Sequence, residues 1–452
     1  MTFDIAMMMI AIVLSLVYMM ARFKIHRAPT VVGVTFLTLF AMHGISALPY
    51  AQGDVGRELS QGVPVSPYFP AVVGLSFAFF AVGATMMAFW LNADLPTLQE
   101  SYYRQPLEPS RVNLPSFLLF AVVSVVLGML FVYGAGDTGV EMLTHQSRHD
   151  ATLREFRLNF KQANPYWYWG MLVNSVFGPI LLVVAMVEAR AVRSVTWGAT
   201  AAVLFIVLVL TSTANLHKAP LALLVLTVSL GAMLSRAELD HKRMRRFWVW
   251  IVAVVGVVGG VGYYLTYSLE ADQAWQATLD RIFVVPQICL DEFLFVYPKI
   301  VDFNYGRGIG LVAKMLGDSG YVAPAFMVAQ IITGDARTSS NAFWSSELWA
   351  AFGFVGVIAG SMFVGALMVW LDNYCLRKRR TPTSIATYAF LTVACLRMPS
   401  ISLFTALLSG GIALGPIFTA VFLERRFFQS DDHANPTAAA PMKLRVHARR
   451  GS

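Results

Sequence analysis

Residues 341–360 read NAFWSSELWAAFGFVGVIAG and join the longest hydrophilic part of the chain to one of its hydrophobic segments. The hydrophilic part begins at about Ser268 and carries five cations among acidic and aromatic residues, namely Arg281, Lys299, Arg307, Lys314 and Arg337. An apolar run of about 20 residues is long enough to cross the hydrocarbon core of a bilayer as a helix. The stretch therefore predicts a long extramembrane loop that leads directly into a membrane-spanning helix.

The composition of the whole chain is typical of a membrane protein. Its 452 residues are 57% hydrophobic and 13% charged, with a mean hydropathy of +0.61. A soluble domain has about 25% charged residues, so this chain has too few polar side chains to cover a water-exposed surface. The formal net charge of +8 is expected from the cationic loops and basic tail of a membrane protein and does not predict nucleic-acid binding.

Eleven apolar runs of about 20 residues, bounded by polar or proline-containing turns, predict eleven transmembrane helices. Their approximate spans are 3–21, 30–50, 69–91, 115–134, 166–187, 195–214, 219–235, 247–266, 342–371, 384–398 and 403–423. The predicted fold class is therefore an all-α polytopic membrane protein.

The positions of the cations predict how these helices are oriented. Short loops rich in Lys and Arg stay in the cytoplasm. Alternation from an outer N-terminus places 22 of the 34 Lys and Arg residues in inner loops and in the C-terminal tail. The remaining cations lie mostly in two long outer loops, which the rule exempts. We therefore predict an outer N-terminus and a cytoplasmic C-terminus.

This topology predicts a single transmembrane domain over residues 1–424. Residues 135–165 and 267–341 would form two long extracytoplasmic loops, and residues 425–452, rich in Asp, Ala, Pro and basic residues, predict a disordered cytoplasmic tail. The chain has three cysteines in three different segments, which predicts neither a disulfide framework nor a metal site. They are Cys289, Cys375 and Cys395.

The first outer loop contains a segment of helical periodicity that ends at Lys161. Arg154, Arg157 and Lys161 recur at spacings of three and four residues, so a helix would place all three on one face. Such a face could bind a pyrophosphate through guanidinium contacts and a point-charge lysine, or it could contact lipid headgroups. His145 and His149 lie four residues apart, but no further ligand accompanies them and no metal site is predicted.

Three arginines of the second outer loop are candidates for contact with an anionic ligand. Arg281 precedes the apolar stretch 286–297, which predicts an amphipathic or re-entrant element in the outer interface. Arg307 and Arg337 lie in flexible, glycine-containing surroundings and could close on a ligand. The alternatives are a salt bridge between Arg281 and a loop acid such as Asp280, and simple solvation of the other two arginines.

Further polar residues lie at or near predicted helix ends on the outer side. Glu347 lies about one turn inside the ninth predicted helix, where an unpaired carboxylate is costly. It is a candidate general base toward a sugar hydroxyl or a partner for an arginine. His217 and Lys218 form a short turn between two helices, and Lys218 could instead extend to the interface. Arg397 ends the tenth helix, where it needs a carboxylate or phosphate partner. His43 is expected to be a hydrogen-bonded core histidine.

These candidates lie together at the outer boundary of the predicted bundle, and few charged residues are predicted near the bilayer midplane. A protein that couples an ion gradient would need such midplane charges. The excess of cations, with a few acids and aromatics, instead favours an interfacial site for a polyprenyl-linked pyrophosphate and a carbohydrate.

Three stretches of the chain form a recognisable set. They are Leu216-His-Lys-Ala-Pro-Leu-Ala-Leu-Leu-Val-Leu, Arg281-Ile-Phe-Val-Val-Pro286, and Asn341-Ala-Phe-Trp-Ser-Ser-Glu347 leading into Phe352-Gly-Phe-Val-Gly-Val-Ile-Ala-Gly360. Together with the pattern of helices and two long outer loops, they resemble the Wzy-type O-antigen and oligosaccharide repeat-unit polymerases of bacteria.

The resemblance implies a GT-C-like glycosyltransferase of the bacterial inner membrane, with a periplasmic N-terminus. Donor and acceptor would both be undecaprenyl-pyrophosphate-linked glycans, with no cofactor and no obligatory metal. The enzyme would transfer the growing chain from its carrier to a new repeat unit on the periplasmic face and so build a surface polysaccharide. Arg281 would stabilise the leaving pyrophosphate, and Glu347 or His217 would take the acceptor proton. The other pyrophosphate contacts implied are Arg154, Arg157, Lys161, Lys218, Arg307, Arg337 and Arg397.

The same resemblance implies membrane lipids, a chain-length regulator and a flippase as partners, and two other functions stay open. An O-antigen ligase has the same broad architecture but moves the glycan to lipid A-core. That family resembles a scheme with a histidine in the large outer loop, and residues 267–346 contain none. A non-enzymatic lipid-linked glycan flippase or exporter should line a central cavity with cations along its helices, whereas here the cations gather at one face.

Overall fold

The computed structural model describes residues 2–53, 63–108, 112, 114–134, 150–214, 218–236, 241–267, 270–317, 320–336, 338–340 and 343–424. Within these ranges the chain is helical, and the β pairing is limited to an isolated bridge between Val112 and Glu424. The predicted all-α class is confirmed for this part of the chain.

Seven helical segments of the described chain are long and apolar enough to cross a membrane. They are α1 (Phe3–Arg22), α2 with α3 (Val31–Leu39 and Ala47–Gln52), α4 (Phe69–Trp90), α9 with α10 (Trp167–Leu172 and Gly178–Val192), α11 (Val195–Ala214), part of α13 (His241–Tyr267) and α18 (Trp344–Leu376). Each overlaps one of the predicted spans. The protein is therefore a polytopic membrane protein.

Four of the eleven predicted spans are not among these seven segments. Two of them are continuous helices, α6 (Leu114–Tyr133) and α12 (Lys218–Leu234). A third is α19 (Pro382–Ala394), whose 13 residues continue into a 3₁₀ turn, Cys395–Ser400. A total of eleven transmembrane helices stays a prediction.

The fourth predicted span, 403–423, is broken in the structure. It contains two short helices, α20 (Leu403–Leu407) and α21 (Leu414–Phe418), followed by a π-helical turn. The chain turns at Gly411, whose φ of +85° lies in the left-handed region that glycine enters without a steric penalty. Its backbone also lies so close to the ring of Phe390 that a side chain at this position would collide with it. Apolar composition alone does not reveal such a turn.

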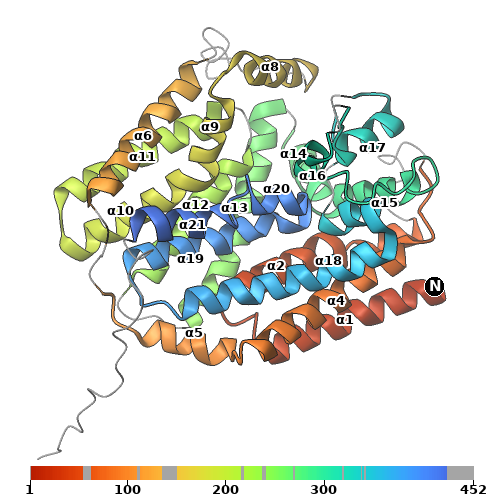
Figure 1. Cartoon of the computed structure of the whole chain (residues 1–452), viewed down its shortest axis with the longest axis horizontal. Coiled ribbons are helices and arrows are strands. Elements are labelled where there is room, and N and C mark those ends of the chain that lie inside the picture. Colours follow the sequence, from red (N-terminus) through yellow and green to blue (C-terminus); the bar gives the residue numbers. More distant parts are fainter. Residues whose placement is uncertain are drawn as a thin grey trace, which may run out of the picture.

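Helices α1, α2, α4 and α18 lie side by side in one part of the bundle (Figure 1). The backbones of α4 and α18 touch at two glycines. A Cβ atom on Gly83 would lie 1.9 Å from the carbonyl oxygen of Met362, and one on Gly365 would lie 2.1 Å from that of Phe80. Small residues allow membrane helices to approach this closely and to gain van der Waals contact along their length.

Helix α18 bends at Gly353, where φ is +60°. The bend releases carbonyl groups that a straight helix would use internally. The carbonyl of Ala350 accepts a hydrogen bond from the backbone N–H of Asn304 (2.9 Å), and that of Ala351 accepts one from Tyr305 (3.1 Å). The long loop before α18 is thereby attached to the first turns of the helix.

Both long loops contain helices. The first includes α8 (Asp150–Ala163), so the predicted helical periodicity at 150–161 is confirmed. The second contains α14 (Ala271–Leu279), α15 (Val285–Val296), α16 (Gly310–Met315) and α17 (Pro324–Thr333). Helix α15 covers nearly the same residues as the expected interfacial element, 286–297, and most of its side chains are buried against neighbouring helices. Its position at a membrane interface stays a prediction.

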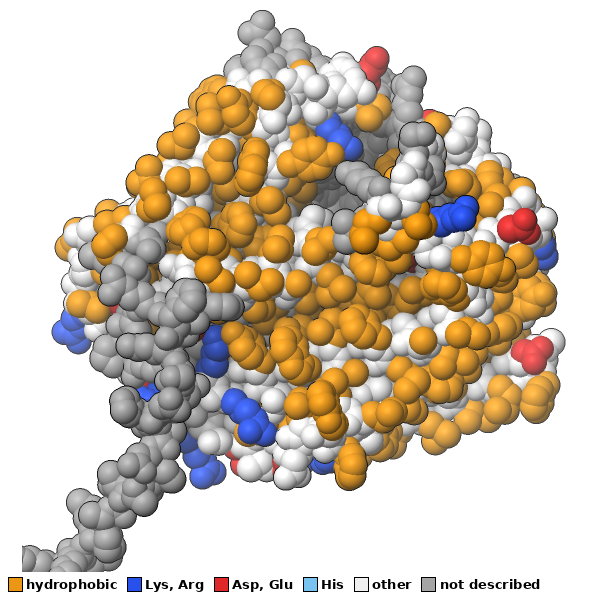
Figure 2. Space-filling view, viewed as in Figure 1, with side chains coloured by type: hydrophobic (Ala, Val, Ile, Leu, Met, Phe, Trp, Pro, Cys, Tyr) orange, Lys and Arg blue, Asp and Glu red, His pale blue; other side chains and the backbone are white. Residues whose placement is uncertain are grey.

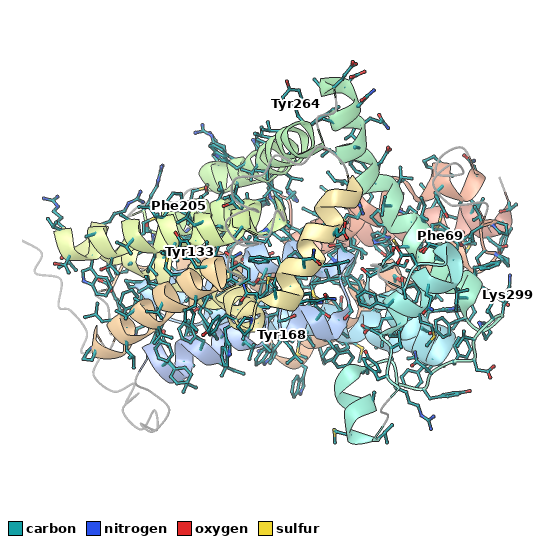
Figure 3. All side chains as sticks on the ribbon, turned by 90° about the horizontal axis from the view of Figure 1, so that it is seen from above. Phe69, Tyr133, Tyr168, Phe205, Tyr264 and Lys299 are labelled. Carbon is teal, nitrogen blue, oxygen red and sulfur yellow. The ribbon has the colours of Figure 1, made fainter. Side chains whose placement is uncertain are left out.

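The surface of the bundle is mainly apolar. Phe89 and Val195 are 88% and 87% exposed, which is costly in water and favourable in lipid. Figure 2 shows apolar side chains over most of one face, with Lys and Arg along the lower-left edge, near α5 (Leu95–Arg104). In Figure 3, Tyr133 and Phe205 lie on one side of the molecule, and Phe69 and Lys299 lie on the other.

The core lies around α19. Its residues 382–393 are all buried, and a capping box between Thr381 and Ser384 closes its first turn. The three cysteines are also buried, and none forms a disulfide: Cys289 on α15, Cys375 near the end of α18 and Cys395 directly after α19. A short, buried helix thus leads directly into the turn that carries Arg397.

Candidate functional site

The turn that follows α19 is held in place by a histidine of the helix α2–α3. His43 Nε2 donates a hydrogen bond to the carbonyl of Pro399 over 2.9 Å. The His43 ring also packs against Phe343, with 4.0 Å between the ring centroids. His43 is buried, as expected of a hydrogen-bonded core histidine. Through Pro399 it fixes the turn on which Arg397 lies.

A narrow cavity lies between α10, α12 and the end of α19. It contains about 380 Å³ of space between atoms when its open mouth is included. Its polar lining residues are Asn174, Ser175, Thr227 and Arg397. Its apolar wall includes Pro179, Pro220, Leu223, Leu224, Phe390 and Val393. The cavity therefore offers a polar region and an apolar wall to the same ligand.

Arg397 lines this cavity and is half-buried. In the part of the chain that the structure describes, no carboxylate or carbonyl pairs with its guanidinium, and the described residues around the cavity include no Asp or Glu. A guanidinium keeps its charge in proteins, and removing it from water costs several kcal/mol unless an opposite charge compensates. The cavity is therefore suited to an anion.

Asn174 supplies a second polar group to the cavity. It lies in the π-helical turn between α9 and α10 and is only 3% exposed. Its Oδ1 atom accepts hydrogen bonds from Ser212 Oγ (2.8 Å) and Thr211 Oγ1 (3.4 Å) of α11. Its Nδ2 atom has no hydrogen-bond partner among the described residues. An unpaired buried donor costs about 1–3 kcal/mol, so this amide is available for a ligand.

Glu347 has a partner within the fold. It lies in the first turn of α18, and its Oε2 atom accepts a hydrogen bond from the backbone N–H of Leu403 over 3.0 Å. Among the described residues no arginine pairs with it. Glu347 therefore holds the start of α20, and the segment from Arg397 to Leu403 connects it to the cavity.

Three other predicted residues are exposed and do not line the cavity. They are Lys161 on α8, Arg281 in the π-helical turn before α15, and Arg307 in the following loop. The alternative of a salt bridge between Arg281 and Asp280 is not seen among the described residues; Asp280 accepts a hydrogen bond from Gln276 over 3.0 Å. The structure thus does not gather these loop cations around Arg397.

The remaining predicted residues are described in part or not at all. Arg154 and Arg157 lie on α8 and Lys218 begins α12, and only their backbones are described. His217 and Arg337 lie outside the described residues. Their proposed contacts with a pyrophosphate stay predictions.

Asn174 was not singled out by the sequence, where it is one amide inside an apolar run. A second polar cluster was also missed. Asp291 on α15 accepts hydrogen bonds from Tyr50 Oη (3.1 Å) and from the backbone N–H of Ser66 (2.8 Å). Burial raises the pKa of Asp291 to about 6. Because each oxygen already has a donor, this cluster joins α15 to the bundle and leaves the cavity at Arg397 as the best candidate site.

Neither a family model, nor a curated protein, nor a solved structure matches this chain.

Proposed function

We propose that the protein is a membrane glycosyltransferase that polymerises undecaprenyl-pyrophosphate-linked oligosaccharide repeat units into a surface polysaccharide on the periplasmic face of the inner membrane. The observation that carries this proposal is the guanidinium of Arg397, which lines a cavity between helices without a described counter-ion. A cation in this position needs an anion. The pyrophosphate of a lipid-linked glycan can supply that anion from within the membrane.

In the proposed reaction, a hydroxyl oxygen of the acceptor repeat unit attacks the anomeric carbon of the donor glycan. The new glycosidic bond forms while the bond from that carbon to the pyrophosphate oxygen breaks. Undecaprenyl pyrophosphate leaves with the electron pair of the broken bond, and a base takes the proton of the acceptor hydroxyl. Glu347 and His217 are the candidate bases.

The developing negative charge on the leaving pyrophosphate is the part of this reaction that a guanidinium can stabilise. Preorganised donors at such a charge are worth about 3–4 kcal/mol each in enzymes. In the proposal, Arg397 acts from the cavity, and a contact from Arg281, which is exposed and does not line the cavity, stays a prediction. The planar fork of an arginine suits two phosphate oxygens better than a lysine does.

The test is a deletion strain complemented with wild type, Arg397→Ala or Arg397→Lys. We expect Arg397→Ala to abolish the long surface polysaccharide while single repeat units are still transferred to their final acceptor. We expect Arg397→Lys to restore only part of it. Arg22→Ala is the matched control, because Arg22 is exposed, forms a surface ion pair with Asp94 at 3.8 Å and does not line the cavity.

The same strain separates the other functions. Long undecaprenyl-linked chains that never reach lipid A-core would indicate a ligase. Lipid-linked repeat units trapped on the cytoplasmic side would indicate a flippase. Normal polymer in a strain that carries the Arg397→Ala protein at wild-type abundance would contradict the role given to this arginine.

A further inference from the structure

Among the described residues, two side chains that line the cavity carry hydrogen-bond donors without acceptors, and they come from different segments. One is the guanidinium of Arg397, after α19, and the other is Nδ2 of Asn174, in the turn between α9 and α10. In the structure, Oδ1 of this amide accepts the hydroxyl of Ser212 on α11. With its Oδ1 atom occupied in this way, Asn174 has only its N–H groups left for the cavity.

We infer that Asn174 and Arg397 together bind one phosphate group of the lipid substrate, and that Asn174 is a specificity-determining residue for it. This inference rests on the proposed function only for the identity of that lipid. A phosphate has several acceptor oxygens and a negative charge, so it can satisfy the neutral donor and the cation at once.

The apolar wall of the same cavity indicates where the rest of the lipid goes. Leu223 and Leu224 of α12 face the site together with Phe390 and Val393 of α19. An alkyl or prenyl chain next to the phosphate can cover these side chains and gain about 0.8 kcal/mol for each buried methylene. A free inorganic phosphate gains none of this.

The test is binding of small probes to the purified full-length protein in detergent. The three probes are farnesyl pyrophosphate, inorganic pyrophosphate and farnesol, with affinity measured by titration calorimetry. We expect farnesyl pyrophosphate to bind more tightly than either of the other two. Asn174→Asp keeps the shape and the acceptor for Ser212 but replaces the donor with a carboxylate beside Arg397. It should lower the affinity for farnesyl pyrophosphate at least about tenfold and leave the affinity for farnesol unchanged.

Two further variants complete this experiment. Asn174→Ser replaces the amide N–H groups with a shorter hydroxyl and adds no charge. It should also lower the affinity for farnesyl pyrophosphate, which guards against an unfolded Asp variant. Thr213→Ala is the control, because Thr213 is exposed and bonds only to backbone carbonyls of its own helix. It should leave the affinities of all probes within about twofold of wild type.

Several outcomes would overturn the inference. Wild-type affinity for farnesyl pyrophosphate in both Asn174 variants would remove Asn174 from the site. Equal loss for farnesyl pyrophosphate and farnesol would show damage to the apolar wall rather than loss of a phosphate contact. Equal affinity for inorganic pyrophosphate and farnesyl pyrophosphate would show that the prenyl chain does not contribute to binding.

The inference and the proposed function fail separately. If the probe binds in an Asn174-dependent manner while a deletion strain still makes normal polymer, the polymerase proposal fails and the lipid-phosphate site stands. If the deletion strain loses polymer and Asn174→Asp restores it fully, the polymerase stands and the role of Asn174 fails.

Discussion

The guanidinium of Arg380 donates two hydrogen bonds to the carbonyl oxygen of Leu234, from Nε over 3.2 Å and from Nη2 over 2.7 Å. Leu234 is the last residue of α12, whose final carbonyls have no partner within the helix. Arg380 also donates to the carbonyls of Gln105 (2.8 Å) and Arg236. A fully buried arginine thus joins the end of α12 to the segments after α5 and α18.

Arg380→Ala should therefore destabilise the protein strongly. The substitution leaves several buried carbonyls without donors and removes the contact between three segments, at a cost of about 3 kcal/mol. Arg379→Ala is the matched control, because Arg379 is exposed and forms a surface ion pair with Glu108 (3.4 Å) that is worth at most about 1 kcal/mol. Thermal unfolding of both variants in detergent measures the difference. Equal midpoints would mean that Arg380 does not hold the end of α12.

Because α4 and α18 approach each other closely, we expect any side chain at Gly83 or Gly365 to destabilise the protein. Gly83→Ala and Gly365→Ala would each place a methyl group against a backbone carbonyl that cannot move aside. The helices must separate, which costs about 1–3 kcal/mol or more. Gly198→Ala on α11 meets no atom within 4 Å and should be neutral or slightly stabilising. The yield of folded protein after size-exclusion chromatography separates these cases, and an unaltered yield for Gly83→Ala would contradict the contact.

The stability of the protein should depend on pH through Asp291. Burial raises the pKa of this carboxyl group to about 6 in the folded protein, compared with about 3.9 in an unfolded chain. Between these two values the folded state binds the proton and the unfolded state releases it. The free energy of unfolding should therefore fall as the pH rises from about 4 to 6, by up to about 3 kcal/mol.

Asp291→Asn removes this titration and keeps a polar group of the same shape beside Tyr50 and Ser66. We expect the variant to lose the Asp291 part of the pH dependence and to be as stable as wild type, or more stable, above pH 6. Asp302→Asn changes an exposed carboxylate and should keep the wild-type profile. The test measures the unfolding midpoints of the three proteins from pH 4 to pH 7. The same pH dependence in wild type and Asp291→Asn would show that Asp291 does not cause it.

Two variants of Glu347 separate its structural contact from a catalytic role. Glu347→Gln keeps an oxygen that can accept the hydrogen bond from Leu403, so the midpoint of unfolding should stay close to wild type. If Glu347 is the base, the same variant should lose polymer by at least about a hundredfold. Glu347→Ala should lose both polymer and about 1–2 kcal/mol of stability. Full polymer from a stable Glu347→Gln protein would leave only the structural contact.

The membrane spans could be predicted from the sequence because they depend on local composition. An apolar run such as 69–91 has few ways to avoid water other than a buried or lipid-facing helix, and α4 occupies almost the same residues. The prediction of one continuous helix over 403–423 was wrong because the chain turns at Gly411. That turn depends on the left-handed backbone of Gly411 and on its contact with Phe390. Those two residues are distant in sequence, and composition carries no information on their contact.

The candidate site was predicted less completely for the same reason. Arg397 was a candidate because a cation near a helix end in an apolar chain is conspicuous by itself. Asn174 becomes informative only after α11 supplies Ser212 to its oxygen and the cavity leaves its nitrogen unpaired. Likewise, Glu347 was expected to be a base or an arginine partner, whereas its described partner is the N–H of Leu403, a contact that requires the break before α20.

Cys289, Cys375 and Cys395 are all buried, so thiol reagents in solution should not reach them in the folded wild-type protein. A membrane-impermeant maleimide added to intact cells should therefore not label the wild-type protein. A single cysteine introduced at an exposed position will then be labelled in intact cells only if it lies on the outer side of the membrane. The side of the membrane on which each loop lies can therefore be mapped without removing the native cysteines, beginning with Arg307→Cys in the long loop and Arg379→Cys after α18.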